Sequence, residues 1–555
     1  MIAECHSNTT NKGICLDVAL QLMLVFVRTH LNLASLPTFI KSVRVFTSKF
    51  PAHFYASLRV QESKKSNRHK TIANVDLYDV HSTLLARLEG CEVVSSETLS
   101  YVEDKESDET ESEDPVVVVG MGVHYPGDAS SVDKFWDTLL NGKICTKPIA
   151  KENLHRHDKV SNRMYGGLNT DEEEEDILLR VSQDALKGVS KFNPETCGIV
   201  SASLNFPRND VKRKMKELNE DNGEQKQPNP DAATYVAQHL KLGRERYCFD
   251  AACASGLYAL KLASEALLHG DAETMLCGAC TKPESYFVLH GFSTFRALAS
   301  EGTSSAPLQN KTNGMVPGEG CAVLVLKRRS KALQDKDTIY GVLQSVHVEN
   351  AGRGLPLKPD LEREIECMRT GITGFEDKIQ YVECHSTGTP LGDHTEIDAM
   401  RAAYKELPLL GTTKGNFGHT LVASAFAGVV KVLLSMKHGI IPPTPHVKSG
   451  GDFVSNQVVS SMTKCDLKCA AVNAFGFGGT NAVCVIGHPA STLVKRCCRP
   501  RPSQIAVCGL AAHFNDTYVL SSLSFLSFSS FAICFVIFIC SRCTFSCLST
   551  SGSSK

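Results

Sequence analysis

The feature that most constrains the fold is a long stretch, residues 115–489, in which strand-like and helix-like segments alternate. Short apolar runs bounded by turn residues predict buried strands, and longer periodic runs predict helices that end at glycine. The clearest strands are expected at 197–200, 273–277 and 322–326, and the clearest helices at 255–269 and 423–438. Such alternation favours an α/β domain in which helices cover parallel sheets.

This stretch opens with four valines, residues 116–119, followed by Gly120, Met121 and Gly122. The pattern predicts a buried strand that turns tightly into a helix at the glycines. A dinucleotide-binding turn needs a third glycine three residues later, and the chain has Tyr125 there. The sequence therefore gives no support to binding of a nicotinamide cofactor.

Four shorter regions flank this stretch. Residues 1–98 have the character of part of a folded domain, and residues 99–114 are an acidic, self-repelling linker. A basic linker at 490–503 leads into residues 504–555, which become rich in Ser, Phe and Cys. The chain of 555 residues is thus expected to hold more than one folded unit.

Composition narrows the setting of the protein. The net charge of −1 gives no indication of a nucleic-acid surface. The chain has 22 cysteines, but its polar N-terminus lacks the pattern of a signal peptide. Secretion and a disulfide framework are therefore not expected, and a reducing, cytoplasmic compartment is. The pair Cys540 and Cys543 has no second pair to complete a zinc site, and no metal is expected.

The first candidate for chemistry is Cys253, in the segment Asp-Ala-Ala-Cys-Ala-Ser-Gly at 250–256. A cysteine just before a helix meets free backbone N–H groups and the positive end of the helix dipole, and both favour the nucleophilic thiolate. A single cysteine is nevertheless more often an inert buried residue. Further polar residues are needed to support a catalytic interpretation.

Two histidines in glycine-rich segments supply that support. His385 follows a strand-like run in Glu-Cys-His-Ser-Thr-Gly-Thr-Pro, and His419 ends Thr-Lys-Gly-Asn-Phe-Gly-His. A helix-start cysteine with two such histidines is typical of a nucleophile and its partners. The glycine-rich segment 475–481 is either a plain tight turn or a loop whose N–H groups help to form an oxyanion hole.

These four segments, in this order, resemble the signature blocks of β-ketoacyl synthases across 115–489. The resemblance implies a duplicated thiolase-like fold of αβαβα layers and a homodimer. It implies that Cys253 accepts the acyl group, and that His385 and His419 bind the malonyl thioester and drive its decarboxylation. Lys414 would order the site, with Glu396 as its acidic partner.

The same resemblance assigns residues that bind substrate. Thr387 and Thr389 match residues that contact the phosphopantetheine arm, and the N–H groups of Cys253 and Phe477 match the oxyanion hole. Two positions depart from the family pattern, which are Ser386 in place of Gly or Ala and Val483 where His is common. Neither departure removes a reacting group.

Finer features resemble the ketosynthase of polyunsaturated fatty acid synthases, in the subunit where a chain-length-factor domain follows. The segments 275–298, 350–359 and 414–445 carry this resemblance. Residues 505–514 resemble the opening strand of that next domain, after which the likeness stops. The apolar, Ser-rich run 518–547 is interpreted as an artefactual or disordered tail rather than a membrane anchor.

The N-terminal region also carries a resemblance. Residues 16–21, 74–79 and 88–90 resemble the second half of a polyketide-type hot-dog dehydratase, an α+β fold. Asp17 would match its catalytic acid. The partner histidine is normally in the first half, so we expect a leftover, non-catalytic fragment.

The expected reaction is a decarboxylative Claisen condensation of an acyl thioester with malonyl-carrier protein. The chain itself would bind no cofactor. Its partners would be an acyl carrier protein with its phosphopantetheine arm and other synthase domains, without nucleic acid or membrane. The chain shows no acyltransferase elbow and no carrier serine motif.

Three alternatives remain open. A non-catalytic chain-length factor would lack Cys253, and a thiolase would carry a second cysteine near the C-terminal glycine loop. A membrane protein is suggested only by the apolar run 519–540.

Overall fold

The computed structural model divides the chain into two compact units, residues 110–501 and residues 1–109 with 502–555. Each is described by itself. The described residues are 2–6, 34–39, 42–47, 53–60, 70–96, 114–149, 160–204, 231–283, 285–309, 312–352, 358–447, 456–491, 512–514 and 517–519.

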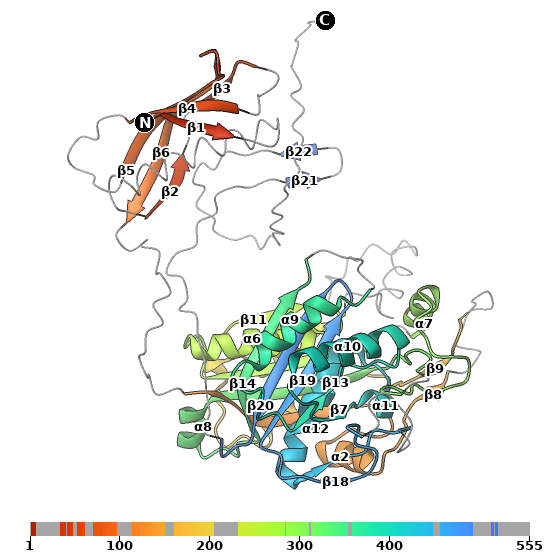
Figure 1. Ribbon diagram of the computed structural model, residues 1–555. Helices are drawn as coiled ribbons and strands as arrows, with labels where there is room; N and C mark the ends of the chain where they lie inside the picture. Colours follow the sequence, from red (N-terminus) through yellow and green to blue (C-terminus); the bar gives the residue numbers. More distant parts are fainter. Residues whose placement is uncertain are drawn as a thin grey trace, which may run out of the picture. The chain divides into compact units, whose positions relative to one another are not determined.

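The described part of the larger unit is built around a ten-stranded sheet whose two halves repeat one topology (Figure 1). The first half contains β7 (Val116–His124), β10 (Cys197–Ser203), β11 (Arg246–Phe249), β12 (Thr274–Thr281) and β13 (Gly320–Arg328). The second contains β14 (Gly341–Asn350), β15 (Tyr381–Glu383), β16 (Leu409–Gly411), β19 (Cys469–Gly476) and β20 (Thr480–Gly487).

The repeat is visible in the strand order, β11-β10-β12-β13-β7 followed by β14-β20-β19-β15-β16. In each half the third, second and fourth strands along the chain are parallel, and the fifth is antiparallel to both the fourth and the first. The halves meet where β7 pairs with β14 through only two residue pairs. The duplication is therefore confirmed, but the expected parallel sheets are mixed ones.

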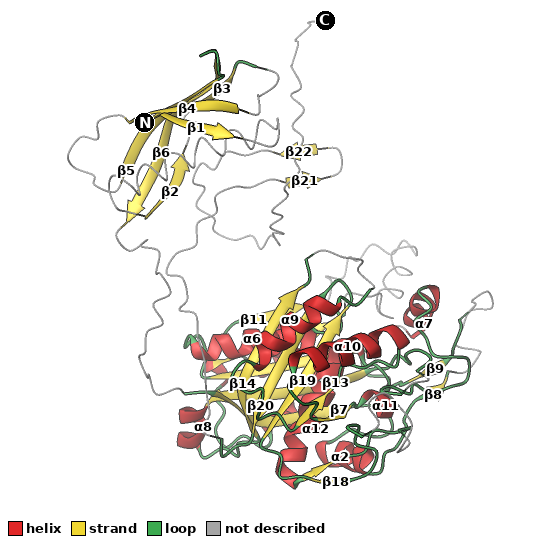
Figure 2. Ribbon diagram, viewed as in Figure 1, coloured by secondary structure: helices red, strands yellow, loops and turns green. Residues whose placement is uncertain are grey.

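The contacts between helices and strands define three helix layers around the two halves of the sheet. Figure 2 shows helices packed against the strands of this sheet. The central layer holds α6 (Ser255–Leu268) and α12 (Ser424–His438), which contact each other and both halves of the sheet. One outer layer holds α3 (Glu174–Leu186) and α5 (Ala232–Leu240), and the other holds α9 (Leu361–Ile372) and α10 (Pro390–Ala403). Three separate apolar cores fill these interfaces, so the expected αβαβα layering is confirmed.

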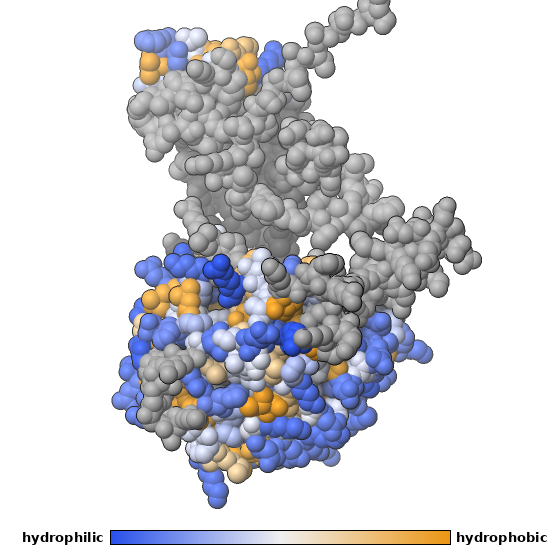
Figure 3. All heavy atoms as spheres, turned by 90° about the vertical axis from the view of Figure 1, so that its right-hand side faces the viewer, coloured by the Kyte–Doolittle hydropathy of each residue, from blue (hydrophilic) through white to orange (hydrophobic). Residues whose placement is uncertain are grey.

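Shorter elements complete this unit. They are α2 (Val132–Leu140), α7 (Ser285–Thr294), α8 (Arg329–Asp335), α11 (Lys414–Phe417), the 3-10 turns η3 (Pro194–Thr196) and η4 (Leu421–Ala423), and the strand pairs β8 (Lys147–Pro148) with β9 (Met164–Tyr165) and β17 (Ile440–Ile441) with β18 (Thr463–Lys464). The visible face of this unit in Figure 3 is mostly hydrophilic, with small apolar patches.

The expected turn into a helix at Gly120 is wrong, because β7 continues through both glycines to His124. The glycines instead let α3 approach the strand closely. A Cβ atom at Gly120 would lie 2.3 Å from the carbonyl oxygen of Ala185, and one at Gly122 would lie 2.3 Å from that of Val181. The signal interpreted as a turn was therefore a helix-packing signal.

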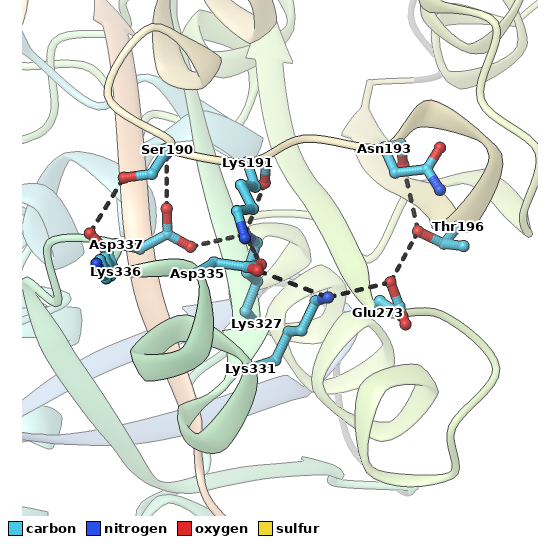
Figure 4. Close-up of polar contacts among 10 residues, drawn as sticks. All are labelled: Ser190, Lys191, Asn193, Thr196, Glu273, Lys327, Lys331, Asp335, Lys336 and Asp337. Carbon is cyan, nitrogen blue, oxygen red and sulfur yellow. Dashed lines mark hydrogen bonds and ion pairs between the residues drawn. The ribbon is translucent and has the colours of Figure 1, made fainter.

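A buried lysine joins several outer segments of the first half (Figure 4). Lys327, at the end of β13, is fully buried and donates from Nζ to Asp335 at 2.8 Å and to Asp337 at 2.6 Å. It also donates to the carbonyl of Lys191 at 2.8 Å. All three N–H groups of the ammonium therefore donate hydrogen bonds, and two of the acceptors are carboxylates, as a buried charge requires.

Both ends of the unit are fastened to one short segment at the start of α8. Asp114 accepts hydrogen bonds from Ser330 N at 2.7 Å and Ser330 Oγ at 2.5 Å. The side chain of Arg329 donates to the carbonyls of Ser491 at 2.7 Å and Pro489 at 3.4 Å. The expected boundaries at 115 and 489 fall beside these contacts.

The described part of the smaller unit is an antiparallel sheet. Its strands are β1 (Ile2–His6), β2 (Ala34–Phe39), β3 (Ser42–Val45), β4 (His53–Val60), β5 (Lys70–Tyr78) and β6 (Leu84–Ser96), in the order β1-β4-β5-β6-β2, with β3 also pairing with β6. Asp76 is fully buried there between Arg59 and Arg87. Burial opposes ionisation, but the two arginines hold the pKa of Asp76 below its usual value. Asp17 lies outside the described residues.

One short hairpin is described after residue 501, formed by β21 (Ala512–Phe514) and β22 (Thr517–Val519). The apolar tail beyond Val519 lies outside the described residues, so its interpretation stays a prediction. Within the described part of the chain, only the helical stretch Leu421–His438 is long and apolar enough to cross a bilayer, and 89% of it is buried in the fold.

Candidate active site

The predicted nucleophile lies in the tight connection between β11 and α6. Cys253 comes two residues before the first residue of α6, and Ala252 adopts a left-handed φ of 52°. This conformation is uncommon for a residue with a side chain, so neighbouring contacts must hold it. Ser255 Oγ accepts a hydrogen bond from Ala251 N at 2.8 Å and donates one to the Ala252 carbonyl at 2.6 Å. These bonds fix the position of the sulfur.

Both predicted histidines lie on loops of the second half, and both line the same cavity as this sulfur. His419, between α11 and α12, places Nε2 3.0 Å from Sγ of Cys253. The ring of His385, between β15 and α10, has its centroid 5.5 Å from the centroid of the His419 ring. The fold therefore brings three residues from distant parts of the sequence into one site.

Burial dominates the electrostatics of the site. It lowers the pKa of His385 and His419 well below the usual range, and the charge of Lys414 adds to the effect, so both imidazoles are neutral at physiological pH. Burial also raises the pKa of the Cys253 thiol to about 11, although Lys414 and the N–H groups of Phe477 and Cys253 oppose this. The expectation of a resting thiolate is therefore wrong, because desolvation outweighs the helix-start effect.

The thiol instead has a neutral base in contact. Since Nε2 of His419 lies 3.0 Å from Sγ, the proton can leave the sulfur for the imidazole as the sulfur attacks. His419 Nδ1 makes no hydrogen bond to any described residue.

Glu396 shapes the loop that carries His385. Its carboxylate accepts hydrogen bonds from His385 N at 2.8 Å, from Ser386 N at 2.6 Å and from Ser386 Oγ at 2.8 Å. Asn473 Nδ2 donates a fourth at 3.0 Å. Ser386, noted in the sequence as a departure, thus adds a hydroxyl donor to this carboxylate. The other departure, Val483, lies in the apolar core beneath α9.

Lys414 is buried and donates from Nζ to the carbonyl of Cys384 at 3.4 Å. Burial lowers its pKa, while the charges of Glu383 and Glu396 oppose the shift. Its relation to Glu396 is therefore one of charge, since the oxygens of Glu396 bond to the His385 loop. A second buried cation, Lys431, pairs with Glu383 at 3.0 Å.

Cys253, His385 and His419 all line one cavity of about 690 Å³. Thr387 and Thr389 also line it, with their hydroxyl oxygens 3.1 Å apart. The remaining lining includes three partly exposed apolar side chains, Leu361, Leu391 and Phe477. The cavity can therefore take an apolar chain together with a polar arm.

The glycine-rich segment 475–481 closes one side of the site. A Cβ atom at Gly476 would lie 3.1 Å from the backbone nitrogen of Cys253, and Gly478 and Gly479 have φ of 85° and 77°. The close approach lets the N–H of Phe477 reach the sulfur. Phe475, whose ring centroid lies 6.0 Å from that of His385, is a site residue that sequence reasoning did not single out.

Two further site residues were missed. Asn473 precedes the glycine-rich segment, and no spacing rule connects it to Glu396. Glu364 lines the cavity from α9, and its helical position is that of an ordinary first-turn acid. The roles of Asn473 and Glu364 can be recognised only in the folded structure, where distant helices and strands come together.

Comparison with known families agrees with this geometry. The model of the β-ketoacyl synthase N-terminal domain matches residues 113–196 and 178–332, and that of the C-terminal domain matches 340–448. Together these matches cover more than half of the chain.

The model of the polyketide synthase dehydratase N-terminal domain matches residues 14–100. The dehydratase resemblance is confirmed, but its assignment to the second half is wrong. The matched model describes the N-terminal domain, and the match includes residue 17, so the catalytic role of Asp17 stays a prediction.

Relatives and solved structures point the same way. A polyunsaturated fatty acid synthase protein of Thraustochytrium sp. is 38% identical over 472 residues, which is 73% of this chain and 23% of that protein. The structure of the PfaC keto synthase-chain length factor has a TM-score of 0.61 at 26% identity, covering 72% of this chain and 50% of that one.

A type II polyketide ketosynthase, in a structure with its acyl-carrier protein and bound to the hexaketide, has a TM-score of 0.58 at 22% identity. It covers 67% of this chain and 98% of that one, and at this identity it supports the fold alone. The chain spans less than a quarter of the length of the fatty acid synthase protein. Both halves of the duplicated domain are matched in their proper order, and the chain belongs to the β-ketoacyl synthase family.

Proposed function

We propose that this chain condenses an acyl thioester with malonyl-carrier protein in the synthesis of polyunsaturated fatty acids or polyketides. The observation that carries the proposal is the contact of Cys253 Sγ with His419 Nε2 at 3.0 Å, beside His385, in a cavity of about 690 Å³. A chain-length factor would lack this cysteine, and the 475–481 loop offers no second thiol for thiolase chemistry.

The first half-reaction is transfer of the acyl group. Sγ of Cys253 attacks the carrier thioester while its proton passes to His419 Nε2 and then to the departing pantetheine sulfur. The N–H groups of Cys253 and Phe477 stabilise the tetrahedral oxyanion. The products are acyl-Cys253 and a free carrier thiol.

The second half-reaction forms the carbon–carbon bond. Malonyl thioester loses carbon dioxide, and the electrons of the broken bond form an enolate. The neutral imidazoles of His385 and His419 donate hydrogen bonds to its oxygen, which requires His419 to carry its proton on Nε2 once Cys253 is acylated. The enolate carbon attacks acyl-Cys253, the carbon–sulfur bond breaks, and the sulfur takes up a proton from the solvent to restore the thiol.

The phosphopantetheine arm of an acyl carrier protein is the proposed carrier of both substrates. Thr387 and Thr389 support this, since their hydroxyls line the cavity at the start of α10. The ketosynthase solved with its acyl-carrier protein shares the fold. The chain is expected to bind no cofactor of its own and to act in the cytoplasm beside other synthase domains.

A homodimer is also proposed. Strand β11 is the edge strand of the first half of the sheet, and Tyr247 on it is half exposed. Among the described residues no further strand pairs with β11, and an edge of this kind is suited to pairing with a second copy. Light scattering on residues 110–501 tests this, and a stable, active monomer would contradict it.

The experiment that tests the function is intact-protein mass spectrometry of Cys253 after incubation with a panel of acyl-carrier thioesters. We expect a single acyl adduct on Cys253, which is discharged as the β-ketoacyl product when malonyl-carrier protein is added. An adduct that never discharges, or no adduct with any acyl chain, would contradict the proposal. The preferred acyl chain would also report the product class.

A further inference from the structure

A second group of ligating side chains lies outside the reacting residues, between β14 and α9. His347 and Glu349 are two positions apart on β14 and therefore face the same side of the strand. Cys367 on α9 lies over them. One ligand atom of each residue lies within 4.8 Å of the other two.

The polar atoms of this group are poorly satisfied. Nε2 of His347 is buried and makes no hydrogen bond with the described residues, and it lies 3.5 Å from Oε2 of Glu349. Cys367 is a free thiol and fully buried. One turn earlier on α9, Glu364 is nearly buried, and its Oε2 also has no hydrogen-bond partner in the described part of the chain. Buried polar atoms without partners are costly, and a cation bound between these residues would satisfy the nitrogen of His347.

We propose that His347, Glu349 and Cys367 form a site for a borderline-soft divalent cation of the zinc class. One imidazole nitrogen, one thiolate and one carboxylate oxygen form a donor set that suits zinc. At zinc–ligand distances the donor atoms of a tetrahedral site are about 3.5 Å apart. The group therefore needs to contract by about 1 Å, within reach of small rotations of the partly exposed His347 and Glu349 side chains.

Charge around the group favours a cation. Glu349, Glu364 and Glu366 all act on the Cys367 thiol through their charges, and Arg363 is the cation that faces Glu349, at 3.9 Å. Arg363 contacts Oε1 of Glu349, while Oε2 faces His347. Binding would release the thiol proton to water and leave a thiolate–metal bond.

The site would act on the substrate cavity through its two elements. Residues Ala351 and Gly352, just after β14, line the cavity, and so do Leu361 and Glu364 of α9. A cation held between Cys367 and the end of β14 would tie these two walls together. No sequence motif reveals the site, because the fold alone brings residue 367 to residues 347 and 349.

The test is cobalt and zinc binding to the full chain after chelator dialysis. Cys253, His385 and His419 also present a thiol and two imidazoles, so the measurement uses the Cys253→Ala background. We expect one equivalent of Co²⁺ with a thiolate-to-cobalt charge-transfer band, and displacement of that ion by Zn²⁺. His347→Gln and Cys367→Ser should each weaken Zn²⁺ binding at least tenfold and abolish the band or shift it.

Matched controls make the result specific. His239→Gln, on α5 in the other half, should leave affinity unchanged, and Arg363→Gln should tighten binding because it removes the competing cation. Circular dichroism shows whether Cys367→Ser still folds, and the partly exposed His347 gives an independent variant if it does not. Absence of the charge-transfer band in Cys253→Ala protein, or equal Zn²⁺ affinity in folded His347→Gln, would overturn the proposal.

Discussion

The two halves of the large unit share one strand order and one pattern of parallel and antiparallel pairs, yet they contribute different chemistry. In the first half, the connection from the third strand β11 to the central helix α6 carries Cys253, the proposed nucleophile. In the second half, the equivalent connection from β16 to α12 carries Lys414 and His419. The site forms where these two equivalent connections face each other.

A second connection of the second half also contributes to the site. The loop after the second strand of the second half, between β15 and α10, holds His385, Thr387 and Thr389. Parallel strands place such loops at their carboxyl ends, which is where α/β folds form their sites. Duplication thus supplies two halves with the same backbone topology. A few side chains in equivalent loops decide which half supplies the cysteine and which supplies the histidines.

The largest effect on activity is expected when the proposed nucleophile of the first half is removed. Cys253→Ala should lower condensation to less than about a thousandth of wild type, because no covalent acyl intermediate can form. The change removes one sulfur atom, so the melting temperature should barely move. Product formation by chromatography and acyl transfer by mass spectrometry measure the loss, with Cys248→Ala on β11 as control. Retained condensation would refute the assignment.

The second-half residues should fail differently. His385→Ala and His419→Ala should each slow malonyl decarboxylation by about 10²–10³-fold, because each removes a donor to the developing enolate charge. Acylation of Cys253 should survive better in His385→Ala than in His419→Ala, since only His419 contacts the sulfur. Release of labelled carbon dioxide measures the first step. Normal decarboxylation in both variants would show that the roles are wrong.

A smaller effect is expected for the residue that positions His385. Glu396→Gln keeps an acceptor but loses charge-assisted hydrogen bonds worth about 1.5 kcal/mol or more, so condensation should fall about tenfold. Decarboxylation should carry this loss, while acylation of Cys253 stays near wild type. An equal loss in both steps would indicate general unfolding of the site instead. Glu376→Gln, in the turn after α9, is the control, since this partly buried carboxylate also accepts a backbone hydrogen bond but lies outside the cavity lining.

The smallest expected effects concern packing of the outer helices. In the first half a glycine on the strand, Gly122, admits α3, whereas in the second a glycine on the helix, Gly371, admits β20 and β14. A Cβ at Gly371 would lie 2.8 Å from Cβ of Val483. Alanine at either position should lower unfolding free energy by about 1–3 kcal/mol. Urea denaturation measures this, and Gly291→Ala on α7, with open space around it, should be neutral or stabilising.

Many of the strands and helices were predictable from the sequence because they depend on local residue patterns. The expected strand at 197–200 lies within β10, and the helices expected at 255–269 and 423–438 correspond to α6 and α12. Gly270 and Gly439, predicted to close these helices, have φ of 78° and 65°. Periodicity and glycine positions depend on the backbone nearby, so they can be read from sequence.

What could not be predicted depends on depth and on contacts between distant segments. The helix-start argument for a thiolate at Cys253 ignored burial, which raises the pKa to about 11. The glycines at 120 and 122 imitated a turn because close packing and turning both require a residue without a side chain. The hydrogen bond from Asn473 to Glu396 joins residues 77 positions apart, and no pattern announces it.

The fastening of Asp114, Pro489 and Ser491 to the single segment Arg329–Ser330 has a modular consequence. The polypeptide therefore enters and leaves the ketosynthase unit at the same place, and the unit has the layout of a domain inserted into a longer chain. Its excision or transplantation would leave two neighbouring ends that a short linker can rejoin, without threading chain across the molecule. Several relatives carry this unit within much longer proteins, and such a layout allows exchange of the unit between genes while its folded interior is preserved.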